Sequence, residues 1–277
     1  MNGFRVFAIV VLAYFLVVDG EILSAQPPQA TAASKTMVQL LPGSLTGGST
    51  PSTMLRDSLH RQANEHFQDW RQAYEERTEL ADIQNYQKRL KDEFINRIGG
   101  LPGPAPINAK ITGTIQREGY KLEKVLFESQ PKFYVTGGLF LPDPAKFPPP
   151  WPAVVVVCGH SDNGKLQEGY QTGTALAALN GLAAMIIDPV AQGERAQLLK
   201  DDGKPAISGS TTEHTLLGSG AILVGWNTAR WMIGDTMAAI DYLQSRDDIR
   251  GDRIGCMGNS GGGTQTSYMM ALDSRVH

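Results

Sequence analysis

Three apolar runs most constrain the fold of this 277-residue chain. Residues 153–158 read Ala-Val-Val-Val-Val-Cys without a polar interruption, a second run of equal length follows at 182–187, and a shorter stretch lies at 253–257. A strand that is apolar on both faces is typical of a parallel sheet covered by helices. Helical patterns at 172–180 and 229–246 alternate with the runs, in the rhythm of strand, helix and strand. The sequence therefore predicts an α/β fold, with a mostly parallel central sheet and flanking helices.

Two further parts are predicted before the first apolar run. Residues 53–98 carry apolar side chains at helical spacing among many charges, which favours two amphipathic helices. Three segments rich in β-branched and aromatic residues then indicate an antiparallel meander: 111–116, 122–128 and 133–141. We therefore expect an N-terminal helical segment at 53–110 and the α/β domain at 111–277.

The first 52 residues differ in composition from the rest. A single positive charge in residues 1–5 precedes the apolar run 6–18, and Leu23-Ser24-Ala25 offers small residues to a signal peptidase. We expect a signal peptide at 1–25, cleaved after Ala25, because the run is shorter than the roughly 20 residues that span a bilayer. Residues 26–52 are expected to be a disordered linker. The prediction is a secreted or periplasmic protein without a stable membrane span after cleavage.

Charge and cysteine content bear on partners and cofactors. The formal net charge is −3, from 25 basic and 28 acidic residues, and no basic run could hold a phosphate backbone. Nucleic acid is therefore not an expected partner. His60 and His66 are expected on helix surfaces rather than as metal ligands, and no cofactor is expected. Cys158 and Cys256 each end an apolar run, which favours buried thiols, with a disulfide as the alternative if their geometry allows it.

A glycine-rich bend after the third run carries the main chemical signal. Residues 258–263 read Gly-Asn-Ser-Gly-Gly-Gly and fit the G-x-S-x-G nucleophile elbow, with a plausible helix after it. Such a bend strains the serine backbone, and side chains at Gly258 or Gly262 would collide with the neighbouring strand and helix. Ser260 is the candidate nucleophile, and the Gly261 amide is a candidate oxyanion donor. The alternative is a simple turn or phosphate cradle, but the lysine and glycine spacings of phosphate loops are absent.

Residues after the two earlier strands should lie at the same edge of the sheet. His160 follows the first strand, and its backbone amide is the candidate second oxyanion donor. Its side chain is not expected to be the catalytic base, because acid and base follow the serine in this fold. The stretch 188–195 follows the second strand and is expected to line the mouth of the site, with Asp188 in a structural role. His214 lies in a long connection at 201–225, a candidate lid or substrate loop, where it contacts substrate or is solvated.

Together these residues resemble the secreted α/β-hydrolases grouped with acetyl xylan esterases and dienelactone-hydrolase-like proteins. The resemblance runs from about Ile111 to His277 and rests on five stretches: 158–160, 188–195, 212–215, 235–246 and 258–263. It implies an α/β-hydrolase fold, Ser260 as nucleophile, and His160 and Gly261 as oxyanion donors. The implied substrate is an acyl ester, with acetylated carbohydrate foremost.

The resemblance also implies a triad acid and base on loops after further strands. Only 17 residues follow Ser260 (277 minus 260), and Asp273 and His277 are the one acid and the one histidine among them. Neither is expected to reach the hydroxyl, so we expect this chain to lack the triad acid and base and the fold to be incomplete at its C-terminus. The prediction is a carboxylic ester hydrolase. The alternatives are a serine peptidase of the same fold, or an inactive carbohydrate-binding or interaction protein.

Overall fold

The computed structural model describes residues 50–277, in two units that divide after Arg77. Helix α2, Met54–Glu75, is the described helix of the first unit. Trp70 stacks on Tyr74 along it, with ring centroids 5.4 Å apart. The predicted signal peptide and almost all of the predicted linker lie outside the described residues. Within 50–277, every helix is too short or too polar to cross a bilayer.

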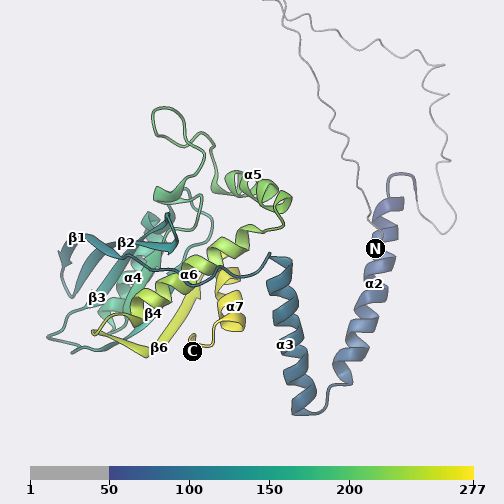
Figure 1. The fold of residues 1–277 in the computed structure, drawn as a ribbon, viewed down its shortest axis with the longest axis horizontal. Coiled ribbons are helices and arrows are strands. Elements are labelled where there is room, and N and C mark those ends of the chain that lie inside the picture. Colours follow the sequence, from purple (N-terminus) through teal and green to yellow (C-terminus); the bar gives the residue numbers. More distant parts are fainter. Residues whose placement is uncertain (1–49) are drawn as a thin grey trace, which may run out of the picture. The chain divides into compact units, whose positions relative to one another are not determined.

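The second unit is built on a mixed six-stranded sheet (Figure 1). Its strands are β1 (Lys110–Arg117), β2 (Tyr120–Gln130), β3 (Phe133–Pro142), β4 (Trp151–Val157), β5 (Ala183–Ile187) and β6 (Ile249–Gly258), in the spatial order β1-β2-β3-β5-β4-β6. The first three form an antiparallel meander, and β3 pairs antiparallel with β5. Strand β4 pairs parallel with both β5 and β6. The predicted meander is confirmed, and the three apolar runs are parallel neighbours as predicted; the antiparallel pairing of β3 with β5 joins both parts in one mixed sheet.

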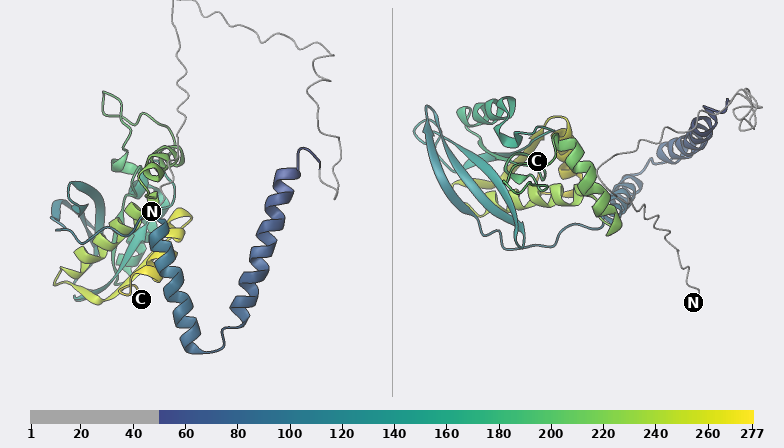
Figure 2. Two further views of the ribbon diagram at one scale, coloured as in Figure 1. Left: turned by 45° about the vertical axis from the view of Figure 1, so that its right-hand side comes forward. Right: turned by 90° about the horizontal axis from the view of Figure 1, so that it is seen from above.

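Helices cover both faces of this sheet (Figure 2). The helices of the second unit are α3 (Leu80–Arg97), α4 (Glu168–Leu179), α5 (Ser210–Leu223), α6 (Thr228–Gln244) and α7 (Gly261–Leu272), with short 3-10 turns at Gly164–Leu166 and Gly193–Arg195. Helix α4 packs on one face, and α6 and α7 pack on the other. This arrangement confirms the predicted α/β-hydrolase fold.

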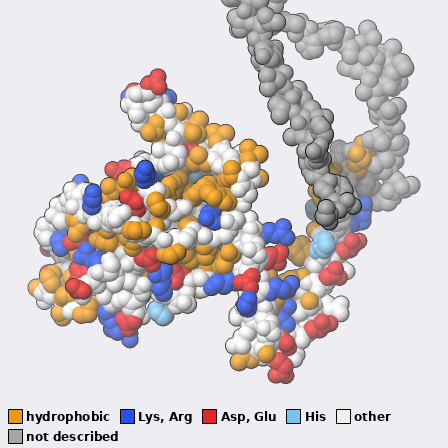
Figure 3. Space-filling view, viewed as in Figure 1, with side chains coloured by type: hydrophobic (Ala, Val, Ile, Leu, Met, Phe, Trp, Pro, Cys, Tyr) orange, Lys and Arg blue, Asp and Glu red, His pale blue; other side chains and the backbone are white. Residues whose placement is uncertain are grey.

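The connection expected at 201–225 differs from the prediction, because α5 occupies most of it. Its glycines and serines suggested a loop, since such residues are poor helix formers. A tertiary contact outweighs that weak preference: the buried Glu213 carboxylate accepts a hydrogen bond from the Leu198 amide at 3.1 Å. The helix is therefore fixed at its first turn. Figure 3 shows hydrophobic side chains gathered in the region of α5. Leu223 at the end of α5 and the following Val224 are both exposed.

The core explains why the first apolar run has no polar interruption. Ala153, Val155 and Val157 of β4 face the α6 and α7 side. Their neighbours Val154 and Val156 face α4. Each fully buried valine stabilises the fold by about 1.5 to 3 kcal/mol, so both faces of the strand must be apolar. The carboxyl ends of β4, β5 and β6 are thereby held at one edge of the sheet.

The two cysteines are free thiols, as the favoured interpretation predicted. Cys158 packs on the α4 side of the sheet, whereas Cys256 lies on the other side, 3.7 Å from the Thr266 hydroxyl of α7. Burial raises the pKa of Cys158 to about 12 and also raises the pKa of Cys256. Because the thiolate is the reactive form, Cys158 is chemically inert at neutral pH.

Candidate active site

The strand-to-helix turn at Ser260 is sharply bent. Strand β6 ends at Gly258 and α7 begins at Gly261, so that Ser260 is the pivot of the turn. Its backbone has φ 54° and ψ −121°, a conformation that costs a residue with a side chain about 1 to 3 kcal/mol. The side chain of Ser260 is exposed at the carboxyl end of a parallel strand. The geometry is that of the predicted elbow, and not of a slack surface turn.

Two glycines allow the turn to pack tightly. A Cβ atom at Gly258 would lie 2.4 Å from the carbonyl carbon of Gly262. A Cβ atom at Gly262 would lie 2.0 Å from the Val157 carbonyl oxygen. Both contacts are far below van der Waals distance and involve backbone atoms that cannot move aside cheaply. The predicted collisions with the neighbouring strand and helix are confirmed.

The loop after β4 lies directly against this elbow. A Cβ atom at Gly159 would be 2.6 Å from the Asn259 carbonyl oxygen and 3.0 Å from Ser260 Cβ. The His160 ring reaches the other side of the turn, since its Nδ1 is 3.3 Å from the Cβ position at Gly261. The structure therefore brings together the three predicted site residues, Ser260, Gly261 and His160. Within residues 50–277, neither the His160 amide nor the Gly261 amide donates a hydrogen bond.

A second histidine, His214 of α5, contacts the first. Its Nε2 lies 2.7 Å from the Val190 carbonyl oxygen, which can only accept, so Nε2 carries the proton. Its Nδ1 then accepts from His160 Nε2 at 3.1 Å. Burial lowers the pKa of His214, which favours this neutral form. His214 is thus half-buried and hydrogen-bonded to His160, rather than a solvated loop residue, and the lone pair of His160 lies on Nδ1, next to Gly261.

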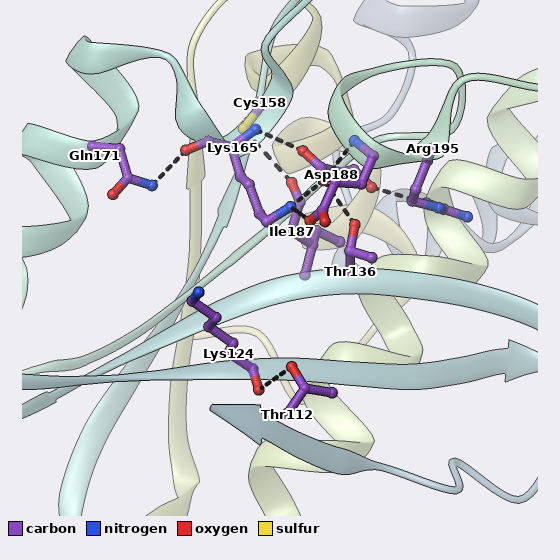
Figure 4. Close-up of polar contacts among 10 residues, drawn as sticks. Thr112, Lys124, Thr136, Cys158, Lys165, Gln171, Ile187, Asp188 and Arg195 are labelled. Carbon is purple, nitrogen blue, oxygen red and sulfur yellow. Dashed lines mark hydrogen bonds and ion pairs between the residues drawn. The ribbon is translucent and has the colours of Figure 1, made fainter. Parts of the chain in front are cut away.

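Asp188, which follows β5, anchors the loops at this edge of the sheet (Figure 4). Its side chain is fully buried and accepts hydrogen bonds from the Lys165 amide and the Thr136 hydroxyl, each at 2.7 Å, and from the Lys165 ammonium group. The Glu194 amide also donates to it, at 3.3 Å. Asp188 is structural, as expected, and no residue of the stretch 188–195 is among those that line the cleft beside Ser260.

Removing the Asp188 carboxylate is expected to reduce the stability of the folded protein. We expect Asp188→Ala to lower the free energy of unfolding by about 3 to 5 kcal/mol, because it leaves the buried Lys165 without its closest counter-charge. Urea unfolding at pH 7 measures the change. The control is Asp202→Ala, which removes an exposed ion pair with Lys204 and should cost less than about 1 kcal/mol. Equal losses for the two variants would contradict the anchoring role.

A cleft of about 770 Å³ opens beside the elbow. Its lining includes His160 and Ser161 after β4, Tyr170 of α4, and Met257 and Asn259 next to the serine. Clefts of about 300 to 1,000 Å³ are typical of small-molecule sites. The cleft can therefore hold a small molecule next to residues 257–259, directly before Ser260, which is not itself among the lining residues.

Asp273 and His277 lie away from the elbow. The Asp273 carboxylate accepts hydrogen bonds from the Arg275 guanidinium group, at 2.7 Å from Nη2. The backbone amide of His277 donates to Ile254, six residues before Ser260 on β6. Val276 forms a parallel bridge with the same residue, as the start of a neighbouring strand would. Among the described residues, neither side chain contacts Ser260, in agreement with the expectation.

Sequence reasoning missed two residues that contact Gly159. The Tyr170 hydroxyl accepts a hydrogen bond from the Gly159 amide at 2.7 Å. The Gln192 side-chain amide donates to the Gly159 carbonyl oxygen at 2.9 Å. The signal for Gln192 is its place directly after a parallel strand, where functional residues gather. Tyr170 lies in the first turn of a helix, and nothing in the sequence sets it apart.

Comparisons with known proteins agree with this geometry. A sequence profile of the Abhydrolase family matches residues 59–276. The Bacillus subtilis protein named "Putative hydrolase YtaP" is 30% identical over 202 residues, which are 67% of this chain and 60% of that protein. A crystal structure of a "putative acetyl xylan esterase" from Bacteroides fragilis is 23% identical, with a TM-score of 0.62, over 73% of this chain and 53% of that one. The structure named "Methylesterase BT1017" is also 23% identical, with a TM-score of 0.55, over 72% and 41%. The chain thus spans between two fifths and three fifths of the length of these relatives.

Proposed function

Because the chain belongs to the Abhydrolase family, we propose that it provides the nucleophile, Ser260, of a serine esterase. The observation that carries the proposal is the strained backbone of Ser260, exposed on a glycine-walled turn at the carboxyl end of a parallel strand. A protein keeps such strain where the surrounding packing enforces it, and such strain clusters at functional sites. The packing of Gly258 and Gly262 enforces it here.

The proposed reaction is acyl transfer in two steps. Ser260 Oγ attacks the ester carbonyl carbon and its proton passes to a general base; the tetrahedral intermediate then expels the alcohol and leaves an acyl-serine, which water hydrolyses. The negative charge on the carbonyl oxygen is stabilised by the His160 and Gly261 amides, which have no other acceptor within residues 50–277. Asp273 and His277 are not placed to act as acid or base. In this fold those groups follow the serine along the chain.

The proposed substrate is a small acyl ester of a carbohydrate, with acetyl as the leading acyl group. The 770 Å³ cleft beside Ser260 suits a substrate of this size. The name of the Bacteroides fragilis protein points to acetylated xylan as a substrate. At 23% identity, that likeness establishes the fold and not the substrate. The predicted signal peptide at 1–25 is consistent with a substrate outside the cell and stays a prediction.

The proposal is tested by assaying the full-length protein on three substrate classes. We expect release of acetate from 4-nitrophenyl acetate and from acetylated xylo-oligosaccharides. Cleavage of peptide anilides without ester hydrolysis would favour the serine peptidase instead. Binding to xylan with no hydrolysis of any substrate would show an interaction protein, and would contradict the proposal.

A further inference from the structure

One peptide group links the two loops of the site. The Gly159 carbonyl oxygen and the His160 N–H belong to the same peptide unit, and Gln192 donates to that carbonyl at 2.9 Å. Pro149-Pro150 is the one cis peptide bond among the described residues, so the Gly159–His160 bond is trans. In a trans peptide the C=O and N–H point in opposite directions. The hydrogen bond from Gln192 therefore also fixes where the His160 N–H points.

The order of the strands shows which direction that is. Strand β4 lies between β5 and β6, and Gln192 follows β5, whereas Ser260 follows β6. When the Gly159 carbonyl points toward the loop after β5, the His160 N–H of the same peptide points toward the elbow after β6. The close approach of Gly159 to Asn259 and Ser260 confirms that the peptide and the elbow lie side by side. The His160 N–H thus faces the serine.

We propose that Gln192 is a positioning residue that holds the Gly159–His160 peptide with its N–H toward the oxyanion formed at Ser260. The inference rests on the proposed esterase function and adds a residue to it. Without the Gln192 amide, the carbonyl loses its buried donor, and a rotation of the peptide would turn the Gly159 oxygen toward the developing negative charge. Repulsion between two oxygens would then replace a hydrogen bond to the transition state.

Gln192 is itself held rigidly enough for this task. The residue is 2% exposed. Its backbone amide donates to the Pro189 carbonyl at 3.2 Å, and its carbonyl accepts from the Arg195 amide at 2.9 Å. A Cβ atom at the next residue, Gly193, would lie 2.3 Å from Asp188 Oδ1, so the loop packs directly on the Asp188 anchor. The contacts of Asp188 therefore also restrict the position of Gln192 and of the Gly159–His160 peptide that Gln192 holds.

The test compares Gln192→Leu and Gln192→Glu with Gln244→Leu in the full-length protein. The control, Gln244→Leu, also removes a glutamine amide that donates to a backbone carbonyl, that of Gly251, but at the opposite end of β6.

Loss of an oxyanion donor costs roughly 10² to 10³ in kcat. We expect Gln192→Leu to lower kcat on 4-nitrophenyl acetate by about 10- to 100-fold, with KM changed by less than about twofold. The Ki of a trifluoromethyl ketone, which forms an oxyanion on the serine, should rise by the factor by which kcat/KM falls. Gln244→Leu should change none of these values.

The Gln192→Glu variant gives an independent readout that loosened packing would not produce. Its carboxylate cannot donate to the Gly159 carbonyl, but its protonated carboxyl group can. The ratio of its kcat/KM to that of the wild type should therefore rise as pH falls from 8 to 5.

Three outcomes separate this inference from the proposed function. If Ser260→Ala is inactive but Gln192→Leu keeps kcat within twofold of the wild type, Gln192 has no positioning role. If Gln192→Leu does not fold, a pH-independent ratio for Gln192→Glu would overturn the inference in the same way. If Ser260→Ala is as active as the wild type, the proposed function itself is wrong.

Discussion

Ser260→Ala is expected to lower kcat for acetyl-ester hydrolysis by about 10⁴-fold or more and to leave KM nearly unchanged. Removing the nucleophile of a serine hydrolase has effects of this order, because the acyl-enzyme cannot form and only the oxyanion donors and binding contacts remain. Steady-state kinetics of the full-length protein on 4-nitrophenyl acetate measure the change. The fold should be unaffected, since Ser260 is exposed and alanine adds no atom to the turn.

The matched control is Ser267→Ala, two turns further along α7. Ser267 is also exposed, and its hydroxyl donates to the Gly263 carbonyl within the helix at 3.1 Å. Its removal should change kcat by less than about twofold. Residual activity of Ser260→Ala within tenfold of the wild type would show that another group forms the acyl intermediate.

Gly262→Ala is expected to destabilise the protein by about 3 kcal/mol or more and to abolish activity in any molecules that fold. The added Cβ would lie 2.0 Å from the Val157 carbonyl oxygen and 2.9 Å from its carbonyl carbon. Inserting an atom into a well-packed region costs about 1 to 3 kcal/mol when side chains can shift, and more when, as here, the neighbour is a backbone strand. Urea unfolding measures the loss, and the fluorescence of the four tryptophans is a suitable signal.

The adjacent residue provides a sharp comparison. A Cβ atom at Gly263 would meet its nearest neighbour, the Gly258 carbonyl oxygen, at 3.5 Å, which is an ordinary contact. Because alanine is the better helix former by about 1 kcal/mol, Gly263→Ala should leave stability unchanged or raise it slightly. A loss below 1 kcal/mol for Gly262→Ala, or equal losses for both variants, would contradict the packing described for the elbow.

Much of the fold could be predicted because it depends on local patterns. An unbroken run such as the valines at 154–157 is typical of a strand that is covered on both faces, and the structure places them in one. Helix α5 was predicted as a connection because its glycines and serines are weak helix formers. The contact that fixes it, from Glu213 to the backbone at 197–198, joins residues about fifteen positions apart, and no periodicity reveals it.

Some residues of the candidate site could likewise be predicted from local patterns, and others could not. Ser260 and Gly261 could be predicted because the glycine pattern of an elbow follows from sterics within five consecutive residues. Gln192 and His214 could not be assigned roles, because their partners, Gly159 and His160, are 33 and 54 positions away. The parallel strands were predicted to bring these loops to one edge of the sheet, but which loops are neighbours depends on the order of the strands, and that order was not predicted.

The central claim is that the hydroxyl of Ser260 is the nucleophile, and labelling with a fluorophosphonate tests it most directly. The full-length protein is treated with the probe, digested with trypsin, and the peptide 254–275 is fragmented in a mass spectrometer. This peptide also contains Ser267 and Ser274, so the fragments locate the adduct among three serines. We predict one adduct per molecule, on Ser260, and none in Ser260→Ala. An adduct on another residue, or a catalytically active protein that remains unlabelled, would contradict the account.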